Sequence, residues 1–194
     1  QEPPKDDITG RLIIAEIDGR PITDEEILNY AYLLFVAGLD TTAWAIRSSL
    51  WYLARNPKDQ ERLRRDPELI SSAVEEFLRT LSPVQAMART ATKDVEVGGC
   101  PIKQGDRVVL AFGSGNRDEE AYPNPDEIII DRDQNRHFAF GVGIHRCLGS
   151  NLGRREVVVA LREFLERVPP FEAVNMDEPW HGVGSLTVRF KREA

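Results

Sequence analysis

The chain has 194 residues, of which 41% are hydrophobic, enough to bury the core of one ordinary globular domain. Its 32 acidic residues exceed its 25 basic residues and give a net charge of -7, which argues against a general nucleic-acid-binding protein. No uninterrupted apolar run reaches the length of a membrane span, so neither nucleic acid nor membrane is an expected partner.

The first 21 residues are acidic and rich in turn formers, with a turn signal at Asp18-Gly19. This pattern predicts the end of a helix followed by a loop. The polar beginning is unlike a signal peptide and has no initiating methionine, so we expect a chain cut from something longer.

A long helix is predicted to start at Thr23, where Thr23 and Glu26 form a capping box. Its apolar pattern continues until Asn56-Pro57, about 32 residues that would extend for about 48 Å. Between residues 30 and 39 it is apolar on nearly every face, which is typical of a helix covered on all sides by other protein.

The segment 37–42, Ala-Gly-Leu-Asp-Thr-Thr, interrupts this apolar helix with polar residues. The hydroxyl group of Thr41 can bond to the helix backbone and loosen or bend that turn. A polar spot facing solvent is the alternative, although the apolar surroundings favour a functional role.

Two shorter helices are predicted next, over residues 57–65 and from Asp66-Pro67 to near Leu81. In the second, the i, i+3 spacing of Glu76 and Arg79 puts a carboxylate and a guanidinium on one face. An exposed ion pair of little energetic value is the alternative interpretation.

The rest of the chain combines short strands with one more helix. Strand candidates, which look like hairpins, are residues 86–91, 95–97 and 107–110, and residues 116–135 are expected to form a long ordered meander. The pattern from Leu152 to Val168 predicts a helix whose buried side packs against the long helix, and residues 186–190 predict a strand. A mainly α protein with small β-sheets, of the α+β class, is therefore expected.

One cysteine stands in a glycine-rich stretch, residues 138–149, Phe-Ala-Phe-Gly-Val-Gly-Ile-His-Arg-Cys-Leu-Gly. Gly141, Gly143 and Gly149 allow the backbone to pass close to a flat ligand or to adopt positive φ. The amides of residues 148–150 are expected to open a helix and to face the sulfur of Cys147, which would favour its thiolate form.

Two side chains near this cysteine also suggest a cofactor site. Phe140 brings an aromatic ring, and His145 offers a donor for an anionic group on the edge of a cofactor. A soft and solitary thiolate points to haem iron. The alternatives are a small buried hydrophobic cysteine, or a zinc site of His137, His145 and Cys147 that lacks a second cysteine pair.

Residues 140–149 closely resemble the haem-binding signature Phe-Gly-x-Gly-x-His/Arg-x-Cys-x-Gly of the cytochrome P-450 (haem-thiolate monooxygenase) family, and every fixed position is filled. Residues 37–41 resemble the family's Ala/Gly-Gly-x-Asp/Glu-Thr motif, and Glu76 with Arg79 resembles its Glu-x-x-Arg pair. The resemblance implies the C-terminal, haem-binding half of the family's fold. Residues 1–194 would then be one portion of a single domain whose N-terminal half is absent.

The resemblance also implies a cofactor and roles for particular residues. The cofactor would be haem b, iron protoporphyrin IX, with Cys147 as the axial ligand of its iron. Asp40 and Thr41 would deliver protons during O₂ activation. The other residues expected to contact the cofactor are Ala37, Gly38, Arg89, Phe140, Gly141, His145 and Gly149.

Three charged residues would have supporting roles by the same resemblance. Glu76 and Arg79 would buttress the proximal side of the haem, and Arg132 would join them, although Ile128-Ile129 stands where the family usually has Phe-Asp. Arg89 would bond a haem propionate through its planar fork. A salt bridge from Arg89 to a neighbouring acid is the alternative.

The implied reaction inserts one oxygen atom from O₂ into a small organic substrate, with electrons from a ferredoxin or a flavin reductase-type donor. The donor would dock on a basic set, Arg146, Arg154 and Arg155, for which a solvated helix start is the alternative. A ligand cysteine must stay reduced, so a cytoplasmic location is expected.

Two further expectations follow if the chain is a fragment of a longer protein. Its apolar long helix should be covered by the missing N-terminal half or by self-association. A haem-free, catalytically inactive fragment and a peroxide-driven haem-thiolate enzyme are the alternatives to the O₂-dependent function.

Overall fold

The computed structural model describes residues 4–133, 135–174 and 186–190. Contacts group the chain into two units, residues 1–41 and residues 42–194. In the first unit α1 (Ile8–Ile13) precedes a hairpin of β1 (Glu16–Ile17) and β2 (Arg20–Pro21). The turn predicted at Asp18-Gly19 is present, with φ of 51° and 76°. The two short strands that it joins were not predicted.

The long helix, α2 (Asp24–Arg55), has the predicted length of 32 residues. Its start is the predicted capping box. The amide of Glu26 donates to Thr23 Oγ1 at 3.3 Å, and the amide of Thr23 donates to Glu26 Oε2 at 2.9 Å. The helix ends before Asn56-Pro57, because a proline at the next position cannot continue it.

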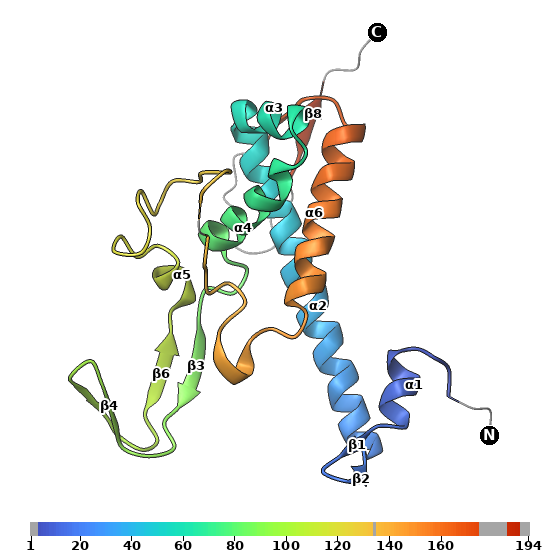
Figure 1. Ribbon diagram of the computed structural model, residues 1–194, viewed down its shortest axis with the longest axis vertical. Helices are drawn as coiled ribbons and strands as arrows, with labels where there is room; N and C mark the ends of the chain where they lie inside the picture. The colour runs from blue at the N-terminus through green and yellow to red at the C-terminus, as the bar shows by residue number, and fades with distance from the viewer. Residues whose placement is uncertain (1–3, 134, 175–185, 191–194) are drawn as a thin grey trace. The chain divides into compact units, whose positions relative to one another are not determined.

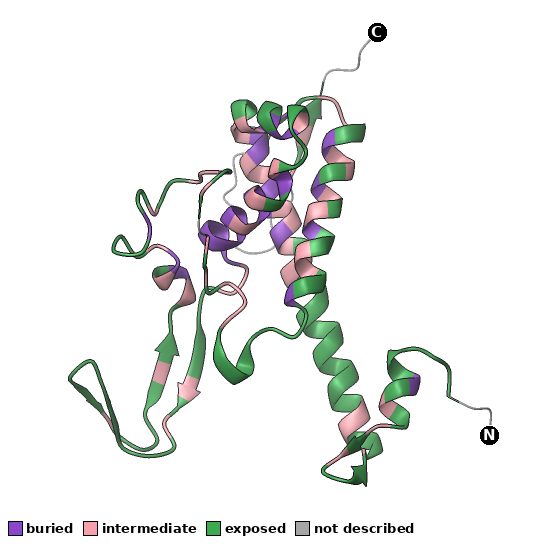
Figure 2. Ribbon diagram, in the orientation of Figure 1, coloured by how far each residue is buried: buried purple, intermediate pink, exposed green. Residues whose placement is uncertain are grey.

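The core of the second unit is formed by four helices: the last third of α2, α3 (Pro57–Arg65), α4 (Leu69–Leu81) and α6 (Ser150–Arg167). Buried residues are concentrated on α4, as Figure 2 shows, and every residue from 76 to 81 is buried. The apolar side chains of this core include Leu53, Leu63, Ile70, Val74, Phe77, Val157 and Leu161.

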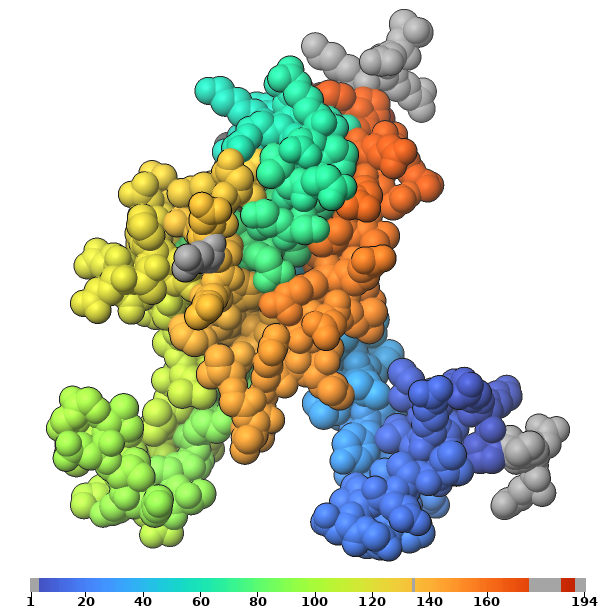
Figure 3. Space-filling model, viewed as in Figure 1, coloured from blue at the N-terminus to red at the C-terminus, as the bar shows by residue number. Residues whose placement is uncertain are grey.

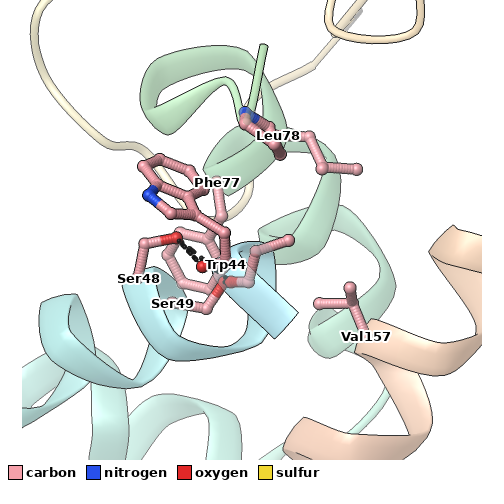
Figure 4. Close-up of a pocket in the computed structure, with 8 residues that line it drawn as sticks. Trp44, Ser48, Ser49, Phe77, Leu78 and Val157 are labelled. Atoms are coloured by element: carbon pink, nitrogen blue, oxygen red, sulfur yellow. Dashed lines mark hydrogen bonds between the residues drawn. The ribbon is translucent and has the colours of Figure 1, made fainter. Parts of the chain in front are cut away.

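Helix α6 packs mainly against α4 and α3, which the sequence did not predict. It also runs beside α2, as predicted (Figure 1): a Cβ at Gly153 of α6 would lie 3.9 Å from Thr42 Oγ1 of α2, and the two helices meet again at Val157. There α2, α4 and α6 surround a small hollow that is lined by Trp44, Ser48, Phe77 and Val157 (Figure 4). The hollow has no room for a water molecule, so it is a packing gap and not a ligand site.

The strands of the second unit form two-stranded antiparallel pairs. β3 (Met87–Thr90) pairs with β6 (Arg107–Leu110), and β4 (Val95–Val97) pairs with β5 (Cys100–Ile102) in a hairpin that the space-filling view shows in light green (Figure 3). β7 (Phe171–Ala173) pairs with β8 (Val188–Phe190), which confirms the predicted C-terminal strand.

Between α5 (Phe112–Gly115) and η1 (Gly143–His145), the described residues contain no helix or strand, as expected for a meander. Together with the short sheets, this confirms the predicted α+β class.

Candidate functional site

The cysteine loop, residues 138–149, is held by its own backbone. The amide of Gly141 donates to the carbonyl of Phe138 at 2.8 Å, and the amide of Cys147 donates to the carbonyl of Phe140 at 2.8 Å. Gly141 and Gly143 have φ of 64° and 70°. A Cβ at Gly143 would meet no atom within 4 Å, so backbone conformation, not lack of space, is the reason for glycine here.

The thiol of Cys147 is exposed, and large apolar side chains are exposed beside it. Ile144 is 97% exposed and Leu148 is 91% exposed. Apolar side chains so fully exposed around a polarisable sulfur mark a surface that a ligand or another protein segment covers. The alternative of a small buried cysteine is therefore wrong.

The alternative zinc site is not supported either. The side chain of His137 is 1% exposed and lies 3.0 Å from Glu75 through its Nε2 atom. His145 and Cys147 are exposed. Among the residues that the structure describes, no group of three His, Cys, Asp or Glu side chains could hold a metal ion.

Helix α6 begins at Ser150, three residues after the cysteine, with Gly149 as its N-cap. The amide of Ser150 donates to the carbonyl oxygen of Cys147 at 3.3 Å. The expectation that the Ser150 amide faces the sulfur is therefore wrong, because the carbonyl oxygen of Cys147, and not its sulfur, accepts the hydrogen bond. A Cβ at Gly149 would lie 4.0 Å from the Cys147 sulfur, an ordinary contact distance.

A second group of side chains surrounds Phe140. The guanidinium of Arg154 lies 4.4 Å from the centre of the Phe140 ring, and its Nε donates to Glu75 Oε1 at 2.7 Å. Burial alone would raise the pKa of Glu75, but hydrogen bonds from His137 and Arg154 outweigh it and hold the pKa below its usual range. Of the proposed docking set, Arg154 is paired with Glu75 and its side chain is 29% exposed, while Arg146 and Arg155 are exposed.

Glu76 and Arg79 form a fully buried pair, with both side chains 0% exposed. Arg79 Nε donates to Glu76 Oε2 at 2.8 Å, and Arg79 Nη2 donates to Glu76 Oε1 at 2.9 Å. Arg132 Nε donates to the same Oε1 at 3.0 Å. The alternative of an exposed ion pair is wrong, because the pair lies in the core.

All five N–H donors of Arg79 are used. Those that do not reach Glu76 donate to the carbonyl oxygens of Asn116 and Pro125, each at 2.7 Å, and of Glu127 at 3.0 Å. Burial alone would raise the pKa of Glu76, but hydrogen bonds from Arg79, from a backbone amide and from Arg132 hold it below its usual range. This network fixes the meander to α4.

Two asparagines of the meander also belong to the network, and no sequence pattern predicted them. Asn135 Nδ2 donates to Glu76 Oε2 at 2.8 Å, and Asn116 Oδ1 accepts from the amide of Phe138 at 2.6 Å. The second bond joins the buried network to the first residue of the cysteine loop.

Arg89 and His145 are the two residues expected to bond anionic groups of the cofactor, and they differ in burial. Arg89 lies on β3, partly buried, and its Nη1 donates to the carbonyl of Ala88 at 2.9 Å. In the described part of the chain no acid forms a salt bridge with it, so the alternative for Arg89 is not supported. His145 ends the short turn η1 and is exposed.

Asp40 and Thr41 belong to the unit of residues 1–41. The hydroxyl of Thr41 donates to the carbonyl of Ala37 at 2.6 Å, and α2 continues through this turn. Ala37, Gly38 and Asp40 are exposed, as are the large side chains of Val36 and Leu39. The exposed Asp40 fits the alternative of a polar spot facing solvent, although the exposed side chains around it are largely apolar.

Comparison with known proteins agrees with these features. Residues 2–187 match the family described as Cytochrome P450. Probable cytochrome P450 127A1 of Sinorhizobium fredii is 48% identical over 82% of this chain and 38% of the relative. The polyketide biosynthesis cytochrome P450 PksS of Bacillus subtilis is 42% identical over 87% of this chain and 42% of the relative. The chain belongs to the cytochrome P450 family.

The fold agrees with the same family. A crystal structure of CYP109E1 from Bacillus megaterium in complex with testosterone matches with a TM-score of 0.85 and 41% identity, over 90% of this chain and 49% of that chain. The chain thus spans less than half the length of its first curated relatives. Family membership implies haem-dependent oxidoreductase chemistry.

No helix in the described ranges has the length and apolar character of a membrane span.

Proposed function

We propose that residues 1–194 form the C-terminal part of a haem-dependent monooxygenase that inserts one oxygen atom from O₂ into an organic substrate. The observation that carries the proposal is the exposed Cys147 thiol in a glycine loop whose apolar side chains, Ile144 and Leu148, are exposed beside it. The family match over residues 2–187 supports the same chemistry.

The residues of the cysteine loop fit haem b. The Cys147 sulfur would bind the haem iron, and the exposed apolar side chains beside it would hold the apolar part of the cofactor. Arg89 and His145 form no ion pair within the described residues and would bond the propionate groups. The remaining contacts would come from Ala37, Gly38, Phe140, Gly141 and Gly149. When bound, the haem supplies O₂ binding and redox chemistry.

Asp40 and Thr41 would deliver protons to the reacting oxygen. The Thr41 hydroxyl donates its proton to the Ala37 carbonyl and still has lone pairs that accept a hydrogen bond. Rotation of the hydroxyl would let it donate its proton to a reacting oxygen while it takes a proton from the Asp40 carboxyl group in its acid form, and the exposed Asp40 carboxylate would then regain a proton from solvent. General acid assistance of this kind typically accelerates a reaction by about a hundredfold or more.

Glu76, Arg79 and Arg132 would support the site without touching the cofactor. They fix the meander to α4, and Asn116 connects them to the start of the cysteine loop. Their proposed role is therefore to hold the loop in the conformation that presents Cys147.

The proposed partners are a small organic substrate and an electron donor of the ferredoxin or flavin reductase type. Arg146 and Arg155 are exposed and would attract an acidic donor, so association should weaken with salt. Both cysteines are free, and the cytoplasm keeps thiols reduced, which supports a cytoplasmic location.

The exposed apolar side chains of α2 are expected to be buried against another protein segment in the working protein. Leu33, Phe35 and Leu39 are exposed, and Figure 2 shows this part of the helix in green. We propose that an N-terminal portion of the same protein covers it, or else a second copy of this chain.

The experiment that tests the function is titration of haem into the purified chain, followed by reduction and carbon monoxide. A strongly red-shifted Soret band is expected, because a thiolate donates electron density to the iron. If no such band develops, the chain is the haem-free fragment. Turnover with hydrogen peroxide, and none with O₂ and a donor, would instead indicate the peroxide-driven enzyme.

A further inference from the structure

One carboxylate on α4 is tied to both ends of the cysteine loop. His137 immediately precedes the loop and Arg154 follows it on α6, and both contact Glu75. Arg154 Nε lies 2.7 Å from Glu75 Oε1, and His137 Nε2 lies 3.0 Å from Glu75 Oε2. Each oxygen of Glu75 therefore holds a different end of the loop.

The hydrogen bonds determine which tautomer of His137 is present. The amide of Ala139 donates to His137 Nδ1 at 3.2 Å, so Nδ1 is an acceptor and carries no proton. The ring proton must then be on Nε2, where it is donated to Glu75. Both ring nitrogens are satisfied, as a side chain that is 1% exposed requires.

The third component is the ring of Phe140. The Arg154 guanidinium lies 4.4 Å from its centre, and the His137 ring lies 6.0 Å from it. The carbonyl of Phe140 accepts from the amide of Cys147 at 2.8 Å. The position of Phe140 therefore sets the position of the Cys147 backbone.

We propose that Glu75, His137 and Arg154 form a clamp that fixes Phe140 and, through its carbonyl, the conformation in which Cys147 presents its sulfur. They are positioning residues, because they act through Phe140. The inference deepens the proposed function and rests on it as far as Cys147 is the haem ligand. The neighbouring Glu76 serves the meander instead, because consecutive residues of a helix point about 100° apart.

The first test needs no haem. Amide hydrogen exchange is measured on the full 194-residue chain with Arg154→Gln, and with Arg162→Gln as the matched control because Arg162 is an exposed arginine of the same helix. The clamp predicts at least tenfold faster exchange of the Cys147 amide in Arg154→Gln, with the slow amides of α4 within twofold of the unchanged chain. The control should behave like the unchanged chain.

Two outcomes of this test would overturn the clamp. One is an exchange rate of the Cys147 amide that is the same in Arg154→Gln as in the unchanged chain. The other is equal acceleration throughout α4 and α6, because Arg154 would then stabilise the fold in general and not the loop in particular. Arg154→Lys retains a cation for Glu75 and for the ring, so it should recover at least half of the lost protection. Failure of that variant to recover any protection would also count against the clamp.

The second test uses the haem-loaded chain. Arg154→Gln should reduce the thiolate-type share of the reduced carbon monoxide complex at least twofold, and Arg162→Gln should leave that share unchanged. Equal shares in the two variants would refute a positioning role. If the unchanged chain binds no haem, the proposed function fails, while the exchange experiment still decides whether the clamp exists.

Discussion

At the scale of single residues, the site depends on which partner each polar atom takes. The Cys147 amide bonds to Phe140, and the Ser150 amide bonds to the Cys147 carbonyl, so the sulfur remains exposed and open to a ligand. Local signals predicted the loop, because Gly141 and Gly143 adopt the positive φ that only glycine takes without strain.

Thr41→Ala should uncouple turnover in the complete enzyme, so that electrons are consumed and hydrogen peroxide is released with little product. The alanine removes the hydroxyl that would pass the proton, and the loss of product should be about a hundredfold. Product formed per electron consumed is the quantity to measure. Thr41→Ser is the control, since it retains a hydroxyl at the same atom and should remain coupled. Normal coupling in the alanine variant would assign Thr41 a structural role only.

At the scale of elements, α4 organises the second unit by sending two adjacent carboxylates in different directions. Glu76 holds Arg79, Arg132 and the meander, whereas Glu75 holds the two ends of the cysteine loop. Both carboxylates are hydrogen-bonded on each oxygen.

Glu76→Gln should lower the free energy of unfolding by about 3–5 kcal/mol, because it leaves the buried Arg79 guanidinium without its counter-charge. Urea denaturation followed by circular dichroism measures this loss. Glu61→Gln breaks the exposed pair between Glu61 and Arg65 and should leave stability nearly unchanged. Equal effects of the two substitutions would mean that the buried network contributes no more than a surface pair.

Stability should also fall in acid. The pKa values of Glu75 and Glu76 are lowered by folding from an ordinary value of 4.5. Their contribution is therefore present above the unfolded pKa and is lost as the pH falls through the folded pKa. The free energy of unfolding, measured by urea titration from about pH 6 downward, should decrease most below about pH 4.5. In a Glu76→Gln variant the free energy of unfolding should decrease less steeply as the pH falls. An identical slope in the variant would exclude Glu76 as a source of the acid sensitivity.

The elements show what the sequence could predict. The start of α2 follows from a capping box and its end from a proline, each a signal next to the boundary that it sets, and the Glu76–Arg79 contact follows from helical spacing. The clamp could not be predicted, because Glu75 is 62 residues from His137 and 79 from Arg154. Arg154 has the sequence context of an exposed basic residue, and only the fold brings it to Phe140. The short strand β5 was not predicted, because its central residue is Pro101, which is typical of turns and strand edges, whereas the equally short β4 has valines at alternate positions.

At the scale of the whole molecule, the chain carries an apolar surface that its own described residues do not cover. The first part of α2 exposes Tyr32, Leu33 and Phe35, as its all-round apolar pattern implied. Such a surface is typical of an interface.

The purified 194-residue chain should therefore self-associate, because burial of this surface releases water from apolar side chains. Light scattering at increasing concentration measures the association. Leu33→Glu with Phe35→Glu should shift the chain toward monomer, whereas Val97→Glu, at an exposed apolar position on β4, should not. A stable monomer at all concentrations would show that the surface of α2 is covered by other residues of the same chain.

The most direct test of the haem-thiolate assignment compares the two exposed cysteines. Haem is added to Cys147→Ser and to Cys100→Ser, and the spectrum of the reduced protein with carbon monoxide is recorded. Serine offers no soft thiolate, so the strongly red-shifted Soret band should disappear in Cys147→Ser and remain in Cys100→Ser. A red-shifted band that persists in Cys147→Ser would contradict the assignment of Cys147 as the ligand.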